Sequence, residues 1–145
     1  MPIPNTITRT LDLQHPQAKV WAALTTLDGL TAWFGSHATG VIAPGEDVVM
    51  RWEQYDDGQQ TLGIKVVDPM SVFAYTWGIS GAPDGDPRRT YVEFRLEPVA
   101  TGTVLTVTES GFAQLPDEWM AQSYGGNTEG WAAELGELVA YLDAA

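Results

Sequence analysis

The chain has 145 residues and a formal net charge of −12, from 19 Asp and Glu against 7 Lys and Arg. A field of this sign repels nucleic-acid phosphates and anionic membranes, so we expect neither as a partner. The absence of cysteine excludes disulfides and thiolate metal sites. No signal peptide and no apolar run of membrane-spanning length is visible, and we expect a cytoplasmic protein.

Alternating apolar and polar residues predict a series of strands along the chain. The alternating segments are residues 6–13, 48–54, 62–66, 72–79, 89–97 and 103–112. Two short helices are expected after the first strand, one beginning at Pro16 and one, residues 29–34, capped by Asp28. Turns are predicted at Asp56-Asp57, and residues 80–87 are predicted to form a mobile loop because they are rich in Gly, Pro and Asp.

The last third of the chain predicts a long amphipathic helix. Its apolar stripe has spacings of four, three and four residues and consists of Trp131, Leu135, Leu138 and Leu142. Paired glycines are poor in helix interiors, so residues 125–126 are expected to break the helical path before it. Consecutive hairpins form an antiparallel sheet with one apolar face, and this helix is the long element available to cover it.

Several motifs resemble the START-like or SRPBCC superfamily, in the branch named after the activator of the ninety-kDa heat-shock protein ATPase. They are Asp-Leu-Gln-His-Pro at 12–16, Trp-Phe-Gly at 33–35, Tyr-Thr-Trp at 75–77, Gly-Thr at 102–103, Ser-Gly-Phe at 110–112, and Asn127 with Gly130-Trp131. The resemblance covers nearly the whole chain. It implies one α+β helix-grip domain over residues 1–145, in which a curved antiparallel sheet grips the C-terminal helix around a cavity.

Aromatic side chains dominate the faces that we predict to point inward. The candidate ligand-binding residues are Trp33, Phe34, Trp52, Phe73, Tyr75, Trp77, Phe94, Glu109, Trp131 and Leu135. Two interpretations stay open for the aromatic residues, an ordinary core and the wall of a ligand pocket, because helix-grip proteins use the same face for both. In the second interpretation, Tyr75 and the indole N–H groups would supply the polar contacts.

Glu109 is the acidic residue that strand alternation places on an inward face. We expect the first and last strands to pair with Leu13 opposite Leu105, and this register places Arg9 opposite Glu109. A buried charge is costly unless it is paired, so an Arg9–Glu109 ion pair is predicted. A structural pair is the first interpretation, and a ligand anchor or a general acid/base is the second.

The remaining polar residues give no catalytic or metal motif. His15 and His37 lack a zinc-ligand spacing, the acidic pairs are explained by turn chemistry, and no cofactor is expected. The sequence therefore predicts a binder of a small apolar or aromatic molecule. A cyclase or hydratase that uses Glu109 and a co-chaperone-like interaction domain are the alternatives, and a homodimer is one option for the oligomeric state.

Overall fold

The computed structural model describes residues 5–53, 58–79, 86–114 and 116–144, with the backbone alone for residues 117–122. The expected turn at Asp56-Asp57 and most of the loop predicted at 80–87 lie outside the described residues. In chain order the elements are β1 (Thr6–Leu13), α1 (Gln17–Thr25), α2 (Leu27–Trp33), β2 (His37–Gly40), β3 (Asp47–Trp52), β4 (Gly58–Asp68), β5 (Val72–Gly78), β6 (Arg89–Val99), β7 (Gly102–Ser110), the 3-10 helix η2 (Phe112–Gln114) and α3 (Asp117–Ala144).

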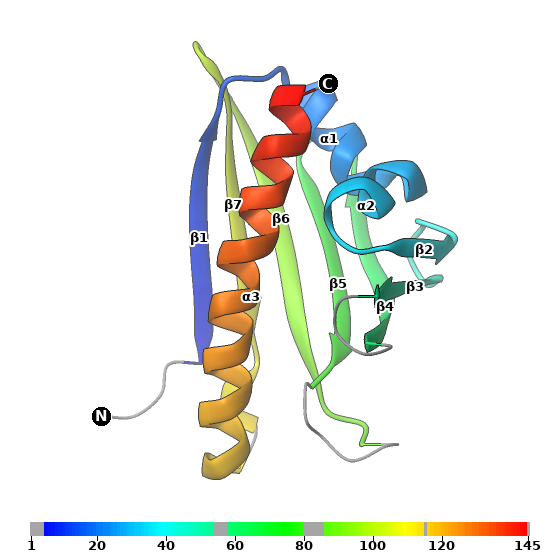
Figure 1. Ribbon diagram of the computed structural model, residues 1–145, viewed down its shortest axis with the longest axis vertical. Coiled ribbons are helices and arrows are strands. Elements are labelled where there is room, and N and C mark those ends of the chain that lie inside the picture. The colour runs from blue at the N-terminus through cyan, green and yellow to red at the C-terminus, as the bar shows by residue number, and fades with distance from the viewer. Residues whose placement is uncertain (1–4, 54–57, 80–85, 115, 145) are drawn as a thin grey trace.

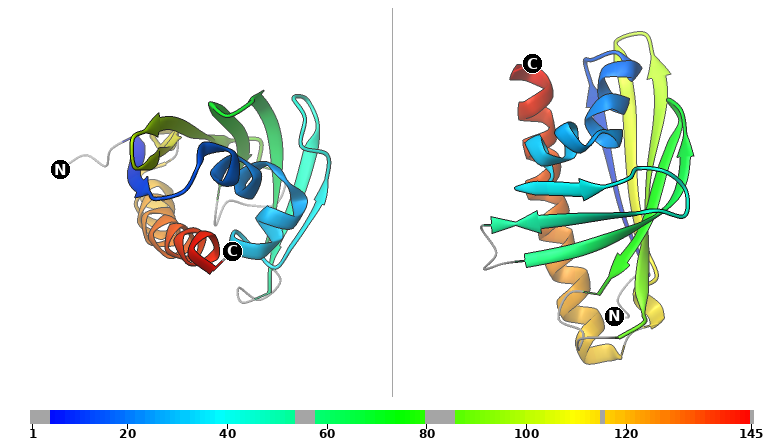
Figure 2. Two further views of the ribbon diagram at one scale, coloured as in Figure 1. Left: turned by 90° about the horizontal axis from the view of Figure 1, so that it is seen from above. Right: turned by 90° about the vertical axis from the view of Figure 1, so that its right-hand side faces the viewer.

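The strands form one antiparallel sheet of seven strands in the order β1-β7-β6-β5-β4-β3-β2. Each strand from β2 to β7 pairs with its neighbour in sequence, and β1 closes the sheet at the β7 edge. The sheet curves around α3, which runs along its concave side (Figures 1 and 2). Helices α1 and α2 lie near the C-terminal end of α3 (Figure 1). The predicted α+β helix-grip architecture is therefore confirmed.

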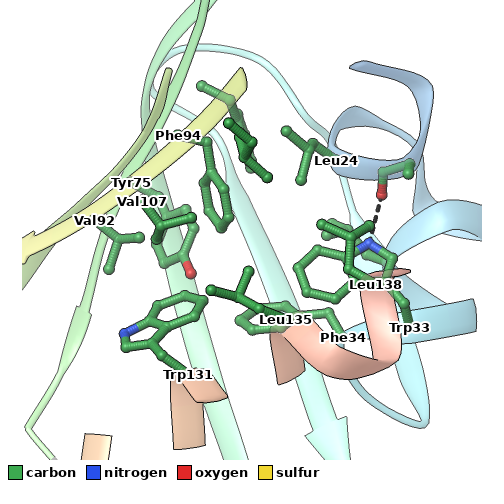
Figure 3. Close-up of a cluster of buried hydrophobic side chains, with 14 of the residues drawn as sticks. Leu24, Trp33, Phe34, Tyr75, Val92, Phe94, Val107, Trp131, Leu135 and Leu138 are labelled. Atoms are coloured by element: carbon green, nitrogen blue, oxygen red, sulfur yellow. Dashed lines mark hydrogen bonds between the residues drawn. The ribbon is translucent and has the colours of Figure 1, made fainter. Parts of the chain in front are cut away.

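The core fills the concave side of the sheet. Alternation in each strand sends every second side chain there, as in β3, where Val48, Met50 and Trp52 are buried and Arg51 is exposed. The predicted helix stripe faces the same core, and its four members, Trp131, Leu135, Leu138 and Leu142, are all buried. Figure 3 shows side chains from the sheet, from the segment around α2 and from α3 meeting there.

The caps of the two short helices differ from the prediction. Thr26 is the N-cap of α2, with its hydroxyl oxygen accepting a hydrogen bond from the backbone N–H of Gly29 at 2.9 Å. The predicted cap, Asp28, lies inside the first turn because the helix begins two residues earlier than expected. Pro16 similarly occupies the N-cap of α1 in an extended conformation, and Gln17 takes the first helical position. Both helices remain where the sequence predicted them.

The expected break at residues 125–126 is wrong, because α3 is continuous over 28 residues and contains both glycines. A glycine costs a helix about 1 kcal/mol relative to alanine. The packing of the stripe around Trp131 outweighs this local cost, as tertiary contacts commonly do for amphipathic helices. Both glycines lie on the exposed side of the helix, so their missing side chains leave no gap in the core.

Replacing Gly125 by Ala is expected to stabilise the protein by about 0.5–1 kcal/mol, since alanine restricts the unfolded chain and favours the helix. A Cβ atom at this position would meet no heavy atom within 4 Å, so no clash opposes the gain. Urea denaturation measures the change. The matched control, Ala140→Gly on the exposed side of the same helix, should lower stability by a similar amount. A loss of stability in Gly125→Ala would contradict a continuous α3.

Candidate functional site

A pocket of about 680 Å³ lies between the middle of α3 and strands β3, β4 and β5. The backbone of α3 approaches β1, η2, α1 and α2, which leaves this space on the other side of the helix. Its volume is in the range that holds a small molecule. The residues that line it are Phe34, Trp52, Gly58, Gln59, Gln60, Trp77, Gly126, Asn127, Glu129, Gly130, Trp131, Ala133 and Glu134.

Four aromatic rings form a connected wall of the pocket. Phe34 occupies the centre of this wall, stacked on Trp131 with ring centroids 5.8 Å apart and on Trp77 at 5.9 Å. Trp52 meets the edge of Phe34 at 5.4 Å. We call these four residues, Phe34, Trp52, Trp77 and Trp131, the aromatic wall. The wall is continuous, so its rings offer one extended apolar surface.

The indole N–H groups of the aromatic wall donate hydrogen bonds to other groups of the protein. Trp52 donates to the backbone carbonyl of Phe34 at 2.5 Å. Trp77 and Trp131 both donate to the carboxylate of Glu109, at 2.7 Å to Oε2 and 2.9 Å to Oε1. Each hydrogen bond fixes the orientation of its ring, so the wall is held in place by polar contacts behind it.

Glu109, on β7, is fully buried and accepts hydrogen bonds from neutral donors. Besides the two indoles, the Asn127 amide donates to both carboxylate oxygens at 2.9 and 3.0 Å, and the Thr90 hydroxyl donates to Oε2. These hydrogen bonds satisfy both oxygens of the buried carboxylate. Glu109 does not line the pocket, and its position is behind the aromatic wall.

The predicted Arg9–Glu109 ion pair is wrong. In the observed register Glu109 lies opposite Ile7 and Arg9 lies opposite Val107, two residues away from the expected pairing. Arg9 donates instead to the carbonyl of its neighbour Thr8. A shift of two residues keeps every side chain on the same face of the sheet, which is why the inward direction of Glu109 was still predicted.

Contacts at the end of β1 explain the register. Leu13 pairs with Thr103, and the Thr103 hydroxyl donates to the carbonyl of His15 at 2.9 Å. Gly102 has a φ of 148°, and a Cβ atom there would lie 2.1 Å from the carbonyl oxygen of Leu13. Only glycine fits this close approach of the β6–β7 turn to β1. The Thr103 hydrogen bond and the close backbone approach at Gly102 position the two strands relative to one another.

Glu134, on α3, is one of the pocket residues that were not predicted from the sequence. It is 7% exposed, lines the pocket, and its Oε2 atom has no hydrogen-bond partner among the described residues. Burial and, to a lesser extent, the charge of Glu137 raise the pKa of Glu134 to about 7, against the opposing effect of the Trp52 indole. Its spacing could have identified it, because a residue three positions after Trp131 lies on the same helix face.

The other predicted site residues divide between wall and core. Phe34, Trp52, Trp77 and Trp131 line the pocket, whereas Trp33, Phe73, Tyr75, Phe94 and Leu135 are buried without lining it. Trp33 donates its indole N–H to the carbonyl of Ala23 at 2.8 Å, which fixes α2 against α1 (Figure 3). The predicted residues thus form two groups, one that borders the pocket and one that is packed in the core.

Tyr75 is a buried hydroxyl without a hydrogen-bond partner among the described residues. Burial raises its pKa well above the usual value, and the carboxylates of Glu109 and Glu134 add to the effect. Its hydroxyl points toward Trp131 in Figure 3. Tyr75 therefore lies behind the aromatic wall as a neutral phenol, and the expectation that it contacts a ligand directly is unsupported by its position.

The two histidines lie outside the pocket. His15 contacts Asp143 at 2.7 Å and Lys19 at 3.1 Å, which joins the start of α1 to the end of α3. His37 contacts Glu53 at 3.0 Å on the surface. Within the described residues, no three His, Cys, Asp or Glu side chains gather as metal ligands. Among the described helices, none is long and apolar enough to cross a membrane.

A curved sheet that grips a C-terminal helix defines the protein as a START-like helix-grip domain. The family model described as "Activator of Hsp90 ATPase homolog 1-like protein" matches residues 14–143. The chain belongs to this family, as its motifs indicated. A search of curated proteins finds no match.

Solved structures with the same fold cover nearly the whole chain. Protein MLL2253 from Mesorhizobium loti has a TM-score of 0.83 and 28% identity, over 97% of this chain and 98% of that one. The Aha1 dimer from Colwellia psychrerythraea has a TM-score of 0.75 and 23% identity, over 94% and 95%. DynU16, a protein of the dynemicin biosynthetic locus, has a TM-score of 0.77 and 23% identity, over 97% and 48%. The last two likenesses concern the fold alone.

Proposed function

We propose that this chain binds a small apolar or aromatic molecule in the pocket between α3 and strands β3–β5. The observation that carries the proposal is the aromatic wall, whose rings border a volume of about 680 Å³. Large aromatic rings in a core normally pack against other side chains on every side. Rings that border open space beside a few polar groups, here Gln60, Asn127 and Glu134, are typical of ligand sites.

Preorganisation supports the same proposal. Glu109 holds the indoles of Trp77 and Trp131, and the Phe34 carbonyl holds that of Trp52. Rings fixed before binding lose little conformational freedom when a ligand arrives, so more of the contact energy becomes affinity. In this proposal Glu109 is a positioning residue, which acts on the ligand through the indoles.

The alternative roles have weaker support. A cyclase or hydratase that uses Glu109 would need this carboxylate to reach the substrate, but it does not line the pocket and both its oxygens accept hydrogen bonds. An interaction domain would not require the pocket. A cytoplasmic location and a homodimer remain part of the proposal, the second because the Colwellia Aha1 relative was solved as a dimer. Light scattering tests the oligomeric state.

A pocket-filling variant tests the proposal without disturbing the core. Gly130 lines the pocket, and a Cβ atom there would meet no heavy atom within 4 Å. Gly130→Leu should therefore abolish binding of the neutral dye Nile red while leaving the denaturation midpoint unchanged or higher. Titration followed by dye fluorescence gives the affinity, which we expect to be micromolar for the unmodified chain.

Gly125→Leu is the matched control, because this exposed residue has equal space but does not line the pocket. It should leave dye binding unchanged. Equal binding by the Gly130→Leu variant, or no binding by the unmodified chain, would contradict the proposal. Native mass spectrometry of freshly purified protein then looks for a co-purifying molecule that is released by Gly130→Leu.

A further inference from the structure

The pocket is acidic as well as aromatic. Glu129 and Glu134 line it, and Glu109 lies behind its wall. All Lys and Arg residues belong to the described part of the chain, and none of them lines the pocket. Arg51 and His37 line a separate pocket of about 190 Å³ that shares Trp52 and Gly58 with the first. A negatively charged ligand would therefore find no positive partner here.

Most hydrogen-bond donors in the pocket are already used by other protein groups, whereas a buried acceptor is not. The indole N–H groups of the aromatic wall and the amide N–H₂ of Asn127 already donate to protein acceptors. The Gln59 and Gln60 side chains are the amide donors that remain among the lining residues. On the acceptor side, Glu134 presents a buried carboxyl oxygen that has no hydrogen-bond partner in the part of the chain that the structure describes. A ligand that donates a hydrogen bond or carries positive charge would satisfy this atom.

We infer that the pocket selects a cationic ligand, an apolar or aromatic molecule that carries an amine or quaternary ammonium group. Indole faces attract cations more strongly than other aromatic side chains do. The cation would lie against the aromatic wall with its charge toward Glu134, and its apolar part would cover the remaining ring surface. The carboxylates also repel anions of the same shape, so the pocket discriminates against them. This inference rests on the proposed function and specifies its ligand class.

The ionisation of Glu134 gives the inference a second, independent readout. Its pKa of about 7 means that the carboxyl loses its proton near neutral pH. The titratable groups around it are Glu129 and Glu137 on α3, Tyr75 on β5 and Glu109 on β7. A bound cation favours the ionised carboxyl, so cation affinity should rise as pH increases through about 7. A neutral ligand should show no such rise.

Three probes of one shape separate charge from hydrophobic contact. Phenyltrimethylammonium, tert-butylbenzene and benzenesulfonate each carry a compact group on one phenyl ring, with positive, zero and negative charge. Titration of each against tryptophan fluorescence at physiological ionic strength gives the affinities. The cation should bind roughly tenfold tighter than its neutral isostere, the ratio that about 1.4 kcal/mol of cation–π and ionic attraction produces. Benzenesulfonate should bind weakest.

Glu134→Gln identifies the group responsible, because it removes the charge and keeps the size. The variant should reduce the ratio of phenyltrimethylammonium affinity to tert-butylbenzene affinity several-fold and remove the pH dependence of that ratio, and saturable binding of tert-butylbenzene reports that the pocket is still present. Glu97→Gln, an equal change of charge at an exposed residue of β6, should leave all affinities unchanged.

Each failure has a distinct meaning. If tert-butylbenzene binds as tightly as phenyltrimethylammonium, the cation preference is refuted and the proposed function stands. If Glu134→Gln leaves the preference intact, the assignment to Glu134 is refuted. If phenyltrimethylammonium, tert-butylbenzene and Nile red all fail to bind, the proposed function itself is refuted.

Discussion

Replacing Glu109 by Gln is expected to lower the free energy of unfolding by about 3–5 kcal/mol. The carboxylate accepts hydrogen bonds from Trp77, Trp131, Thr90 and Asn127 in a fully buried position. A glutamine offers one oxygen, and its N–H₂ group must face an indole N–H on whichever side it lies. A lost hydrogen bond to a charged group costs about 1.5–3 kcal/mol, and at least two are affected. Urea denaturation at neutral pH measures the loss.

Glu97→Gln on β6 serves as the control for this variant, since the same chemical change at an exposed residue should alter stability by less than about 0.5 kcal/mol. A Glu109→Gln variant as stable as the unmodified chain would show that the carboxylate is not the acceptor for the indoles. Because Glu109 orients two rings of the aromatic wall, the same variant should also weaken Nile red binding.

Truncation of Trp131 to Ala is expected to cost about 3–5 kcal/mol, the usual range for a large buried aromatic side chain. Trp131 is 3% exposed, stacks on Phe34 and donates its N–H to Glu109. Its loss would leave a void between α3 and the sheet and an unused acceptor on a buried carboxylate. Thermal and urea denaturation should both show the change.

Trp131→Phe separates the cost of lost packing from the cost of the lost N–H hydrogen bond. Phenylalanine keeps an aromatic ring but has no N–H, so the expected loss is about 1–3 kcal/mol, smaller than for alanine. Trp21→Ala, at a half-buried residue of α1, should cost less than Trp131→Ala. An unchanged denaturation midpoint in Trp131→Ala would contradict the packing of α3 on the sheet.

The arrangement of elements was predictable because alternation determines which strand residues share a face. Phe73, Tyr75 and Trp77 were placed inward from their spacing alone, and the structure has them there. The partner of Glu109 was not predictable, since register depends on where Thr103 and Gly102 meet the end of β1. A two-residue error preserves the faces and changes every cross-strand neighbour.

The sequence pattern does not determine which inward-facing residues pack in the core and which border the pocket. The sequence pattern does not distinguish Trp33 from Trp77, yet Trp33 packs between α1 and α2 and Trp77 borders the pocket. The pocket beside Trp77 is left open because α3 lies toward the β1 side of the sheet. Glu134 was overlooked since the helix stripe was defined by apolar residues. A polar residue three positions after Trp131 belongs to the same face and marks a place where the helix does not seal against the sheet.

Ligand binding between α3 and strands β3–β5 is tested by the indole N–H region of a ¹⁵N–¹H NMR spectrum, recorded during titration with tert-butylbenzene. The signals of Trp52, Trp77 and Trp131 should shift together and saturate, because their rings border the pocket. The signals of Trp21 and Trp33 should stay in place. Saturable shifts at Trp21 or Trp33 without shifts at the aromatic wall, or no shifts at all, would contradict ligand binding between α3 and strands β3–β5.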